Sequence, residues 1–327
     1  MKNFLNKALT IAMIAAGLVC ANHALAQTYP SKPVKLIVPY PAGAPVDNFA
    51  RGLTEGLTKL WGQQVIIESK PGANEIIAAS SVTQAAPDGY TLLLGSDAAF
   101  TQNAFLYSKM PYNADKDLVP ITRAVQFNMV LITRTELKTP TLKDFVALMK
   151  KEGAKHNYAS AGAGGTTHLA MESLKQEASF DMVHAPYKGI APAMQDMIGG
   201  SIDAMIAGAS AAIAQMPTGK VTVLAIAGAK RAKALPDVPT YAEAGYPNVV
   251  SNLYLGLAAP AGTPAAIVNK IAADVAKVMK DKEVLDKFVD PYGYDVIADT
   301  PKQFEAFLAQ DKVSAGKRIK DLGVKLD

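Results

Sequence analysis

The sequence is poor in cysteine, and this excludes several kinds of site. Its 327 residues include one cysteine, Cys20, which lies in an N-terminal segment typical of a secretory signal. If that segment is removed, the mature chain has no cysteine, and so no disulfide framework, thiolate nucleophile or cysteine-based metal site. A secreted chain of this size without disulfides depends on a large cooperative core, as expected in a bacterial periplasm.

A signal peptide is predicted for residues 1–26. The first seven residues carry two lysines, residues 8–19 form a short apolar run, and Ala24-Leu25-Ala26 has the small-x-small cleavage pattern. We therefore expect cleavage near Ala26 and a periplasmic mature protein. A membrane anchor is the alternative, but the apolar run is too short to span a bilayer comfortably.

The chain also lacks a strong excess of one charge. It has 33 Lys and Arg against 29 Asp and Glu, a formal net charge of +4 that falls to +2 when the two signal lysines are removed. There is no dense run of Lys and Arg, so nucleic acid is not an expected partner. A mildly positive chain is compatible with a small anionic ligand.

After the signal, short apolar runs alternate with helical periodicities, which favours a mainly parallel α/β sheet. Strands are predicted at residues 34–40, 64–68, 90–94, 156–160, 181–185, 202–207 and 221–226. Helices are predicted at residues 45–60, 76–85, 264–280 and 301–322, with others beginning near Thr167 and Ile190.

Two apolar, strand-like segments, 121–133 and 252–260, are expected to carry the chain between two domains. Their composition favours rigid hinge strands over flexible linkers.

The loop Pro39 to Pro45 (PYPAGAP) joins the first predicted strand to the first predicted helix. Pro45 suits the first helical position, and the unpaired N–H groups of that turn can bind an anion. Ligands of α/β sheets bind at such carboxyl ends of strands. An ordinary strand-to-helix loop fits these residues equally well. Asp47 would repel an anion, so we favour a role for it in stabilising the helix start.

The segment SAGAGGTTHL, residues 160–169, has the same arrangement: a strand end, glycines, then Thr166 or Thr167 as a helix cap. It lacks the lysine of a Walker loop, and glycines 162, 164 and 165 do not form the dinucleotide fingerprint. Spare hydroxyls and amides suit a carboxylate, and the glycines allow close backbone approach.

No catalytic or metal site is predicted. His156, His168 and His184 have no metal-ligand spacing, and we expect His168 to pack or form a hydrogen bond. Residues 208–212 (GASAA) lack the second glycine of the G-x-S-x-G nucleophile elbow of hydrolases. No pair of a nucleophile and a base is evident in the sequence. The chain is predicted to bind rather than react, without a cofactor.

Ordered motifs along the whole mature chain carry a family resemblance. They are YPSKPVKLIVPYPAGAPVDNFAR, PDGYTLLLG, SAGAGGTTHL, PYKG, GSIDAMIAG, ALPDVPTYAEAGYP and LAAPAGTP. Each is weak alone, but in this order they resemble the Bug family, periplasmic solute-binding proteins of tripartite tricarboxylate transporters. The resemblance implies a Venus-flytrap fold like that of type II periplasmic binding proteins. Domain 1 would comprise residues 27–124 and 255–327, and domain 2 residues 125–254.

The resemblance also implies a ligand and its partners. In the family, the Pro-Ala-Gly loop and the Gly-rich loop oppose each other across the cleft and hold one carboxylate, partly through ordered water. The implied ligand is a di-, tri- or aromatic carboxylic acid, and the implied partners are integral membrane subunits of the transporter; we expect a monomer. The implied ligand-binding residues are Tyr40, Ala42, Gly43, Ala44, Val46, Asp47, Ser96, Ser160, Gly162, Gly164, Thr166, Thr167, Tyr187 and Ala207.

The sequence departs from the family pattern at four places. Ala44 replaces the usual second glycine of the first loop, and the usual PGAGG segment reads PGANE, residues 71–75. Ala207 lies where many relatives carry an acidic residue, which argues against recognition of a ligand amine there and for a more apolar distal pocket. Tyr254 replaces a common tryptophan at the hinge.

Three functions are therefore weighed. The first is transport, in which the closed protein presents its ligand to membrane subunits. The second is sensing, in which the same closed form docks on a receptor or kinase; the sequence does not separate these two. The third, a periplasmic hydrolase, requires a nucleophile–base pair that the sequence does not reveal.

Overall fold

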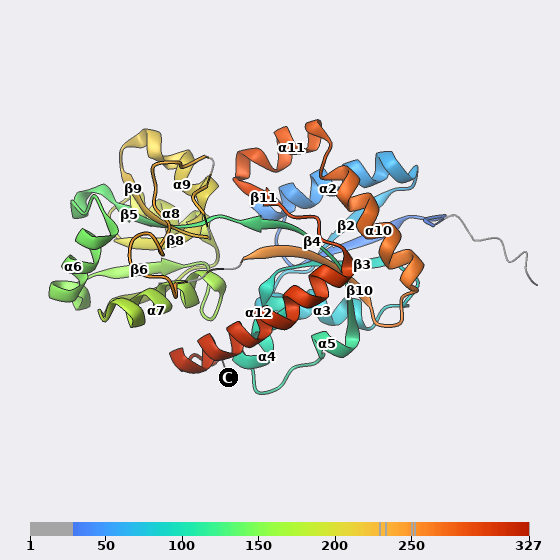
Figure 1. The fold of residues 1–327 in the computed structure, drawn as a ribbon, viewed down its shortest axis with the longest axis horizontal. Helices are drawn as coiled ribbons and strands as arrows, with labels where there is room; N and C mark the ends of the chain where they lie inside the picture. Colours follow the sequence, from blue (N-terminus) through green and yellow to red (C-terminus); the bar gives the residue numbers. More distant parts are fainter. Residues whose placement is uncertain (1–28, 229, 233, 250, 252, 327) are drawn as a thin grey trace, which may run out of the picture.

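The computed structural model describes residues 29–228, 230–232, 234–249, 251 and 253–326 (Figure 1). The predicted signal peptide and Cys20 lie outside these residues. Within the described part, no helix is both long and apolar enough to cross a membrane.

The chain forms two lobes, each built around one sheet with helices on its faces (Figure 1). The first sheet has the strand order β11-β4-β10-β3-β1-β2. Its strands are β1 (Val34–Val38), β2 (Val65–Ser69), β3 (Thr91–Gly95), β4 (Leu118–Phe127), β10 (Tyr254–Pro260) and β11 (Tyr294–Val296). The helices of this lobe are α2 (Pro45–Trp61), α3 (Ile76–Thr83), α4 (Asn103–Leu106), α5 (Ala114–Asp117), α10 (Ala265–Val278), α11 (Lys282–Phe288) and α12 (Pro301–Leu322).

The second sheet has the order β7-β6-β8-β5-β9. Its strands are β5 (Met129–Arg134), β6 (Asn157–Ser160), β7 (Val183–Pro186), β8 (Ala204–Gly208) and β9 (Val221–Ala227). Its helices are α6 (Leu142–Glu152), α7 (Thr166–Ala178), α8 (Ile190–Ile198) and α9 (Ala209–Gln215). Short turns of other helix types are η1 (Ala73–Glu75), η2 (Ala98–Gln102), η3 (Thr135–Leu137), η4 (Gly153–Lys155), η5 (Met216–Thr218) and η6 (Asp290–Tyr292).

The expectation of mainly parallel sheets is wrong, because both sheets are mixed. Parallel pairing is confined to β2-β1-β3 and β7-β6-β8, whereas β4, β5, β9, β10 and β11 pair antiparallel. In the first sheet, the antiparallel pairing of β4 with β10 follows from the path of the chain between the lobes. β4 carries the chain out of the first lobe and β10 brings it back, so the two run in opposite directions and pair antiparallel.

The chain passes from the first sheet to the second at Asn128, between β4 and β5. It returns between the end of β9 and the start of β10. Val125 to Phe127 still pair within the first sheet, against β10 and β11. Both predicted hinge segments thus contain strands that lead from one lobe to the other. The division into residues 27–124 plus 255–327 and 125–254 stays a prediction.

Helix α2 shows how the predicted periodicity builds the core. Val46, Phe49, Leu53 and Leu57 are buried against the first sheet, as their three- and four-residue spacing requires. Leu60, expected on the same face, is 45% exposed in the last turn of the helix.

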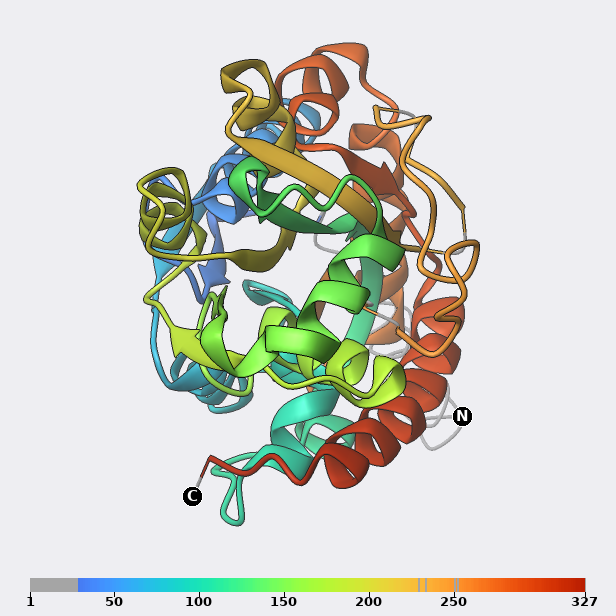
Figure 2. The ribbon, with the colours of Figure 1, turned by 90° about the vertical axis from the view of Figure 1, so that its left-hand side faces the viewer.

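Helix α12 connects the two lobes (Figures 1 and 2). It begins in a capping box between Thr300 and Gln303, and nearby Phe304 is buried in the first lobe. Its C-terminal part packs on α7 of the second lobe, where Ile319 and Leu169 share an apolar cluster. The helix therefore buries apolar surface of both lobes.

Candidate functional site

The two predicted binding loops each end at a helix that lacks a side-chain cap. The cap residue is Ala44 in α2 and Gly165 in α7, and neither helix start receives a side-chain hydrogen bond. The first amides of a helix have no partner within the helix, and the positive end of its dipole favours anions. Both loops therefore present amides suited to a carboxylate, one from each lobe.

Asp47 shapes the first loop from inside the protein. Its side chain is buried, and Oδ2 accepts hydrogen bonds from the Gly43 amide at 2.9 Å and from Arg51 Nε at 2.9 Å. Gly43 has a φ of 84°, a left-handed conformation that glycine adopts without strain. These contacts agree with the favoured interpretation of Asp47 as a residue that stabilises the start of α2.

The predicted threonine cap of the second helix is wrong, because α7 begins after Gly165 with Thr166 in its first turn. Thr167 Oγ1 instead accepts the Ala161 amide at 3.0 Å, which closes the glycine loop. His168 Nδ1 accepts the Gly164 amide at 3.0 Å. His168 thus forms a hydrogen bond, as expected, and that bond requires an unprotonated Nδ1.

A serine–histidine pair at the base of this loop was missed by sequence reasoning. Ser160 Oγ lies 2.7 Å from His184 Nε2 and also bonds the backbone of Gly162. The two residues are 24 positions apart, and only the parallel pairing of β6 with β7 brings them together. His184 stacks on His168 with ring centroids 4.0 Å apart. Ser160 is fully buried, and its hydroxyl links His184 to the Gly162 backbone, so this pair holds the glycine loop in its conformation.

The histidine stack makes the loop sensitive to acid. Burial lowers the pKa of His184 to about 4, with a further contribution from His168, and burial also lowers the pKa of His168. Glu172 and Lys175 face both rings and act in opposite directions. Because these pKa values lie below the ordinary value of 6.5, the neutral rings stabilise the folded state above that pH. This stabilisation is lost as pH falls from 6.5 toward 4.

We therefore expect His184→Gln to weaken the pH dependence of stability. Between pH 7 and pH 4.5 the wild type should lose about 1–2 kcal/mol more free energy of unfolding than the variant, a range reduced for the partial exposure of the ring. Urea unfolding of both proteins at the two pH values measures this. Buried Asp97, whose pKa is raised to about 7 by burial and by Asp311, acts with the opposite sign but equally in both proteins. Identical losses in the two proteins would contradict the prediction.

Among the described residues, one hydrogen bond joins the glycine loop to the opposite lobe. Thr166 Oγ1 donates to Asp97 Oδ2 at 2.8 Å, and Gln102 Nε2 donates to the same oxygen at 2.5 Å. Asp97 Oδ1 is buried and accepts no hydrogen bond from the described residues. Asp97 directly follows Ser96 at the end of β3, so the carboxyl end of the first sheet meets the start of α7 here.

Tyr40 and Ser96, both predicted ligand contacts, are held by a third residue. The Glu75 carboxylate accepts hydrogen bonds from the Tyr40 hydroxyl, from the Ser96 amide at 2.9 Å and from Ser96 Oγ at 2.5 Å. Glu75 was noted in the sequence only as a departure from a glycine-rich segment. That departure was the one signal that pointed to it.

The remaining predicted site residues have varied surroundings. Ala42 is exposed, while Val46 lies in the core of the first lobe. The Tyr187 amide donates to the carbonyl of Ser160, and its hydroxyl donates to Asp196 at 2.6 Å. Ala207 is fully buried in the apolar cluster of the second lobe, so its methyl group presents no surface to a ligand in this conformation.

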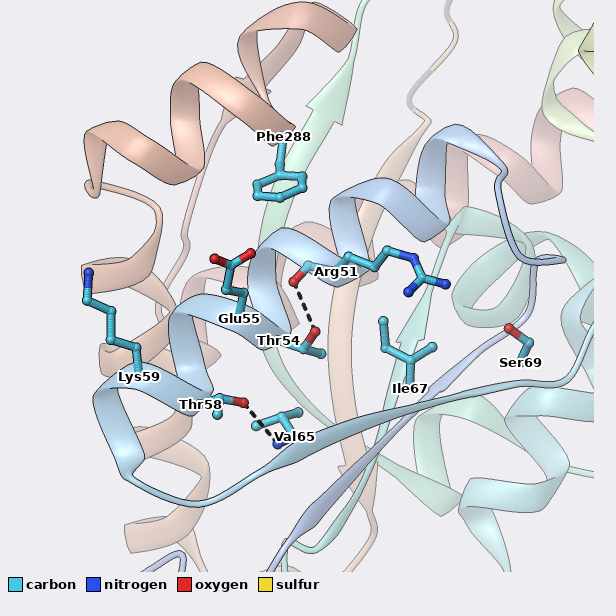
Figure 3. A pocket seen from close by; sticks show the side chains of 9 residues that line it. All are labelled: Arg51, Thr54, Glu55, Thr58, Lys59, Val65, Ile67, Ser69 and Phe288. Carbon is cyan, nitrogen blue, oxygen red and sulfur yellow. Dashed lines mark hydrogen bonds between the residues drawn. The ribbon is translucent and has the colours of Figure 1, made fainter.

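A surface groove lies elsewhere, along α2 and β2 (Figure 3). It has a volume of about 860 Å³ and is lined by Arg51, Thr54, Glu55, Thr58, Lys59, Val65, Ile67, Ser69 and Phe288. None of the predicted ligand-binding residues lines it. In the described part of the chain, no group of three His, Asp or Glu side chains could hold a metal ion.

Two mixed α/β lobes, joined where β4 leads into β5 and where β9 leads back to β10, match the fold of periplasmic solute-binding proteins of the Venus-flytrap type. Residues 49–324 match the family model described as tripartite tricarboxylate transporter family receptor, and the chain belongs to this family.

Individual proteins agree with this assignment. BugT of Bordetella pertussis is 33% identical over 304 residues, which cover 92% of each chain. The structure of the periplasmic binding protein BugD is 32% identical, covers 91% of this chain and 99% of that chain, and has a TM-score of 0.80. MatC from Rhodopseudomonas palustris with bound malate is 30% identical, covers 89% and 100%, and has a TM-score of 0.79. The resemblance to the Bug family is confirmed. The family and these neighbours are solute-binding proteins, not enzymes.

Proposed function

We propose that this chain is a periplasmic receptor that encloses a small organic carboxylate between its lobes and delivers it to the membrane subunits of a tripartite tricarboxylate transporter. The observation that carries the proposal is the pair of uncapped helix starts, one in each lobe, on the loops Tyr40–Asp47 and Ser160–Thr167. The malate bound by the related MatC supports a carboxylate as the ligand.

Ligand capture couples to closure of the lobes. A ligand that contacts loops of both lobes binds the closed form better than the open form and shifts the population toward it. The bond between Thr166 and Asp97 joins the lobes at this place. The closed form then has a surface that the open form lacks, and a membrane partner can recognise it.

A thermal-shift screen tests the proposal. The mature chain is heated with mono-, di- and tricarboxylates, with aromatic acids, and with sugars and metal cations as controls. An acid present at about 100 times its Kd adds about 2.7 kcal/mol to the stability of the folded state and raises Tm. A shift with sugars or cations and none with any acid contradicts the proposal.

Thr166→Val is expected to weaken binding of an acid found in this screen by about 1–3 kcal/mol, because the closed form loses the hydroxyl that donates to buried Asp97 Oδ2 across the lobes. Isothermal titration calorimetry measures the change. Thr218→Val is the matched control, since the Thr218 hydroxyl is exposed and its hydrogen bonds, to the Gln215 carbonyl and from the Lys220 amide, stay within its own turn. Unchanged affinity in Thr166→Val would move the binding site elsewhere.

Delivery of the ligand to a transporter and presentation to a sensor both use the same closed form of the protein. Genes for large and small membrane subunits beside this gene support transport, and a lone gene beside a sensor kinase supports signalling. Export to the periplasm after cleavage near Ala26 is part of the proposal, and N-terminal sequencing of the exported protein tests it. A monomer is expected, and light scattering measures its mass.

A further inference from the structure

The turn before α3 has an uncommon backbone that places a carboxylate inside the first lobe. Ala73, Asn74 and Glu75 have φ values of 45°, 48° and 74°, so three consecutive residues with side chains adopt the left-handed conformation. Each costs about 1 kcal/mol or more relative to the right-handed form. Two hydrogen bonds between Asn74 and Asn103, both of 2.7 Å, hold the turn in place.

This turn directs the Glu75 side chain toward the carboxyl ends of two central strands. Tyr40 follows β1 and Ser96 follows β3, and these strands pair side by side. The Tyr40 hydroxyl and the amide and hydroxyl of Ser96 all donate to the Glu75 carboxylate, which is 6% exposed. These three donors form an anion-binding site, and the Glu75 carboxylate of the chain itself occupies it.

The filled site lies next to the contact between the lobes. Ser96 holds Glu75, and the next residue, Asp97, accepts the Thr166 hydroxyl from the opposite lobe. At the first-lobe side of this contact, Glu75 occupies the donors of Tyr40 and Ser96, while Asp97 Oδ1 is a buried acceptor with no donor among the described residues. A second ligand carboxylate placed here finds no free donor from Tyr40 or Ser96, whereas a hydroxyl, amide or ammonium group can donate to Asp97 Oδ1.

We infer that Glu75 determines specificity by taking the place of a second ligand carboxylate, so that the protein selects acids with one carboxylate and a hydroxyl, amide or ammonium donor at the far end. This inference rests on the proposed carboxylate receptor. It concerns a different position from Ala207, which is buried in the other lobe.

The test compares acids of equal length that differ at one end: adipate, 6-hydroxyhexanoate and 6-aminohexanoate, with succinate and 4-hydroxybutyrate as a shorter set. Calorimetric titration is done on wild type and on Glu75→Gln, which keeps the size of the side chain but replaces one acceptor oxygen by an amide donor. We expect the wild type to bind the hydroxy or amino acid at least tenfold more tightly than the matched diacid. In Glu75→Gln this preference should fall at least tenfold, because the amide can donate to a second carboxylate.

Each outcome has one meaning. A wild type that binds diacids as tightly as their hydroxy analogues overturns the inference, whether or not the variant folds. An unchanged preference in a Glu75→Gln protein with wild-type circular dichroism also overturns it. If no acid of any kind binds the wild type here or in the thermal-shift screen, the proposed function itself fails, which is a different result. Glu283→Gln, a change at an exposed glutamate of α11, is the control and should leave the preference unchanged.

Discussion

Phe304→Ala should lower the free energy of unfolding by about 3–5 kcal/mol, because it removes a fully buried ring that the surrounding core cannot replace. The ring packs edge-on against Phe100 and Tyr254, with centroids 5.5 and 5.9 Å away. It also anchors the N-terminal part of α12, whose other end packs on the second lobe. Urea unfolding measures the loss.

Two controls define this effect. Val313→Ala, on the same helix at a position 73% exposed, should change stability by less than about 0.5 kcal/mol. Gly256 lies beneath the ring, and a methyl group added there would meet Phe304 Cζ at 2.3 Å. Gly256→Ala should therefore be more destabilising alone than in the Phe304→Ala background, by about 0.5–3 kcal/mol. Additive losses would mean that the two residues do not share a packing site.

Asp47→Ala should lower the free energy of unfolding by about 1.5–3 kcal/mol, because it removes a buried charged acceptor from the Gly43 amide and from the start of α2. The first loop then loses its shape, so affinity for an acid ligand should fall about tenfold or more. Urea unfolding and calorimetric titration of the same variant give both values.

Arg51→Ala is the matched control for Asp47. The Arg51 side chain is 56% exposed, so loss of its ion pair with Asp47 should cost about 0–1 kcal/mol. If Asp47→Ala abolishes binding while stability stays at the wild-type value, Asp47 contacts the ligand directly and the structural role is wrong.

Local signals predicted many of the elements. The helix at residues 301–322 was predicted with the bounds that the structure has, and its start carries Pro301 behind a capping box. The helix at residues 45–60 extends one residue further, to Trp61. Helix α6 was missed although Thr141 caps it and Asp144 lies in its first turn, since its apolar positions were not recognised as periodic.

Strand direction was not predictable from local pattern. β4 and β10 are apolar runs like the parallel strands, and burial on both faces gives a strand the same composition in either direction. Their antiparallel pairing follows from the path of the chain between lobes, which relates residues 118–127 to residues 254–260.

In the candidate site, too, some features could be predicted from local sequence and others could not. The loops Tyr40–Asp47 and Ser160–Thr167 could be recognised from the sequence because proline, glycine and hydroxyl residues at a strand-to-helix junction leave helix amides free. The hydrogen-bond partners of the side chains in these loops could not be recognised from the sequence. Ser160 with His184, Thr166 with Asp97, and Tyr40 with Glu75 are pairs separated by 24, 69 and 35 positions.

The sequence by itself determined the α/β class and the two loops, because periodicity and turn chemistry act over a few neighbouring residues, and its ordered motifs carried the resemblance to the family. Only the tertiary structure decided that Asp47 faces inward to hold Gly43, that histidines support the glycine loop, and that Glu75 fills the anion site at β1 and β3. These contacts depend on which strands pair and on where the lobes meet. Hydrogen bonds form only within about 3 Å, a proximity that distant residues gain through the fold alone.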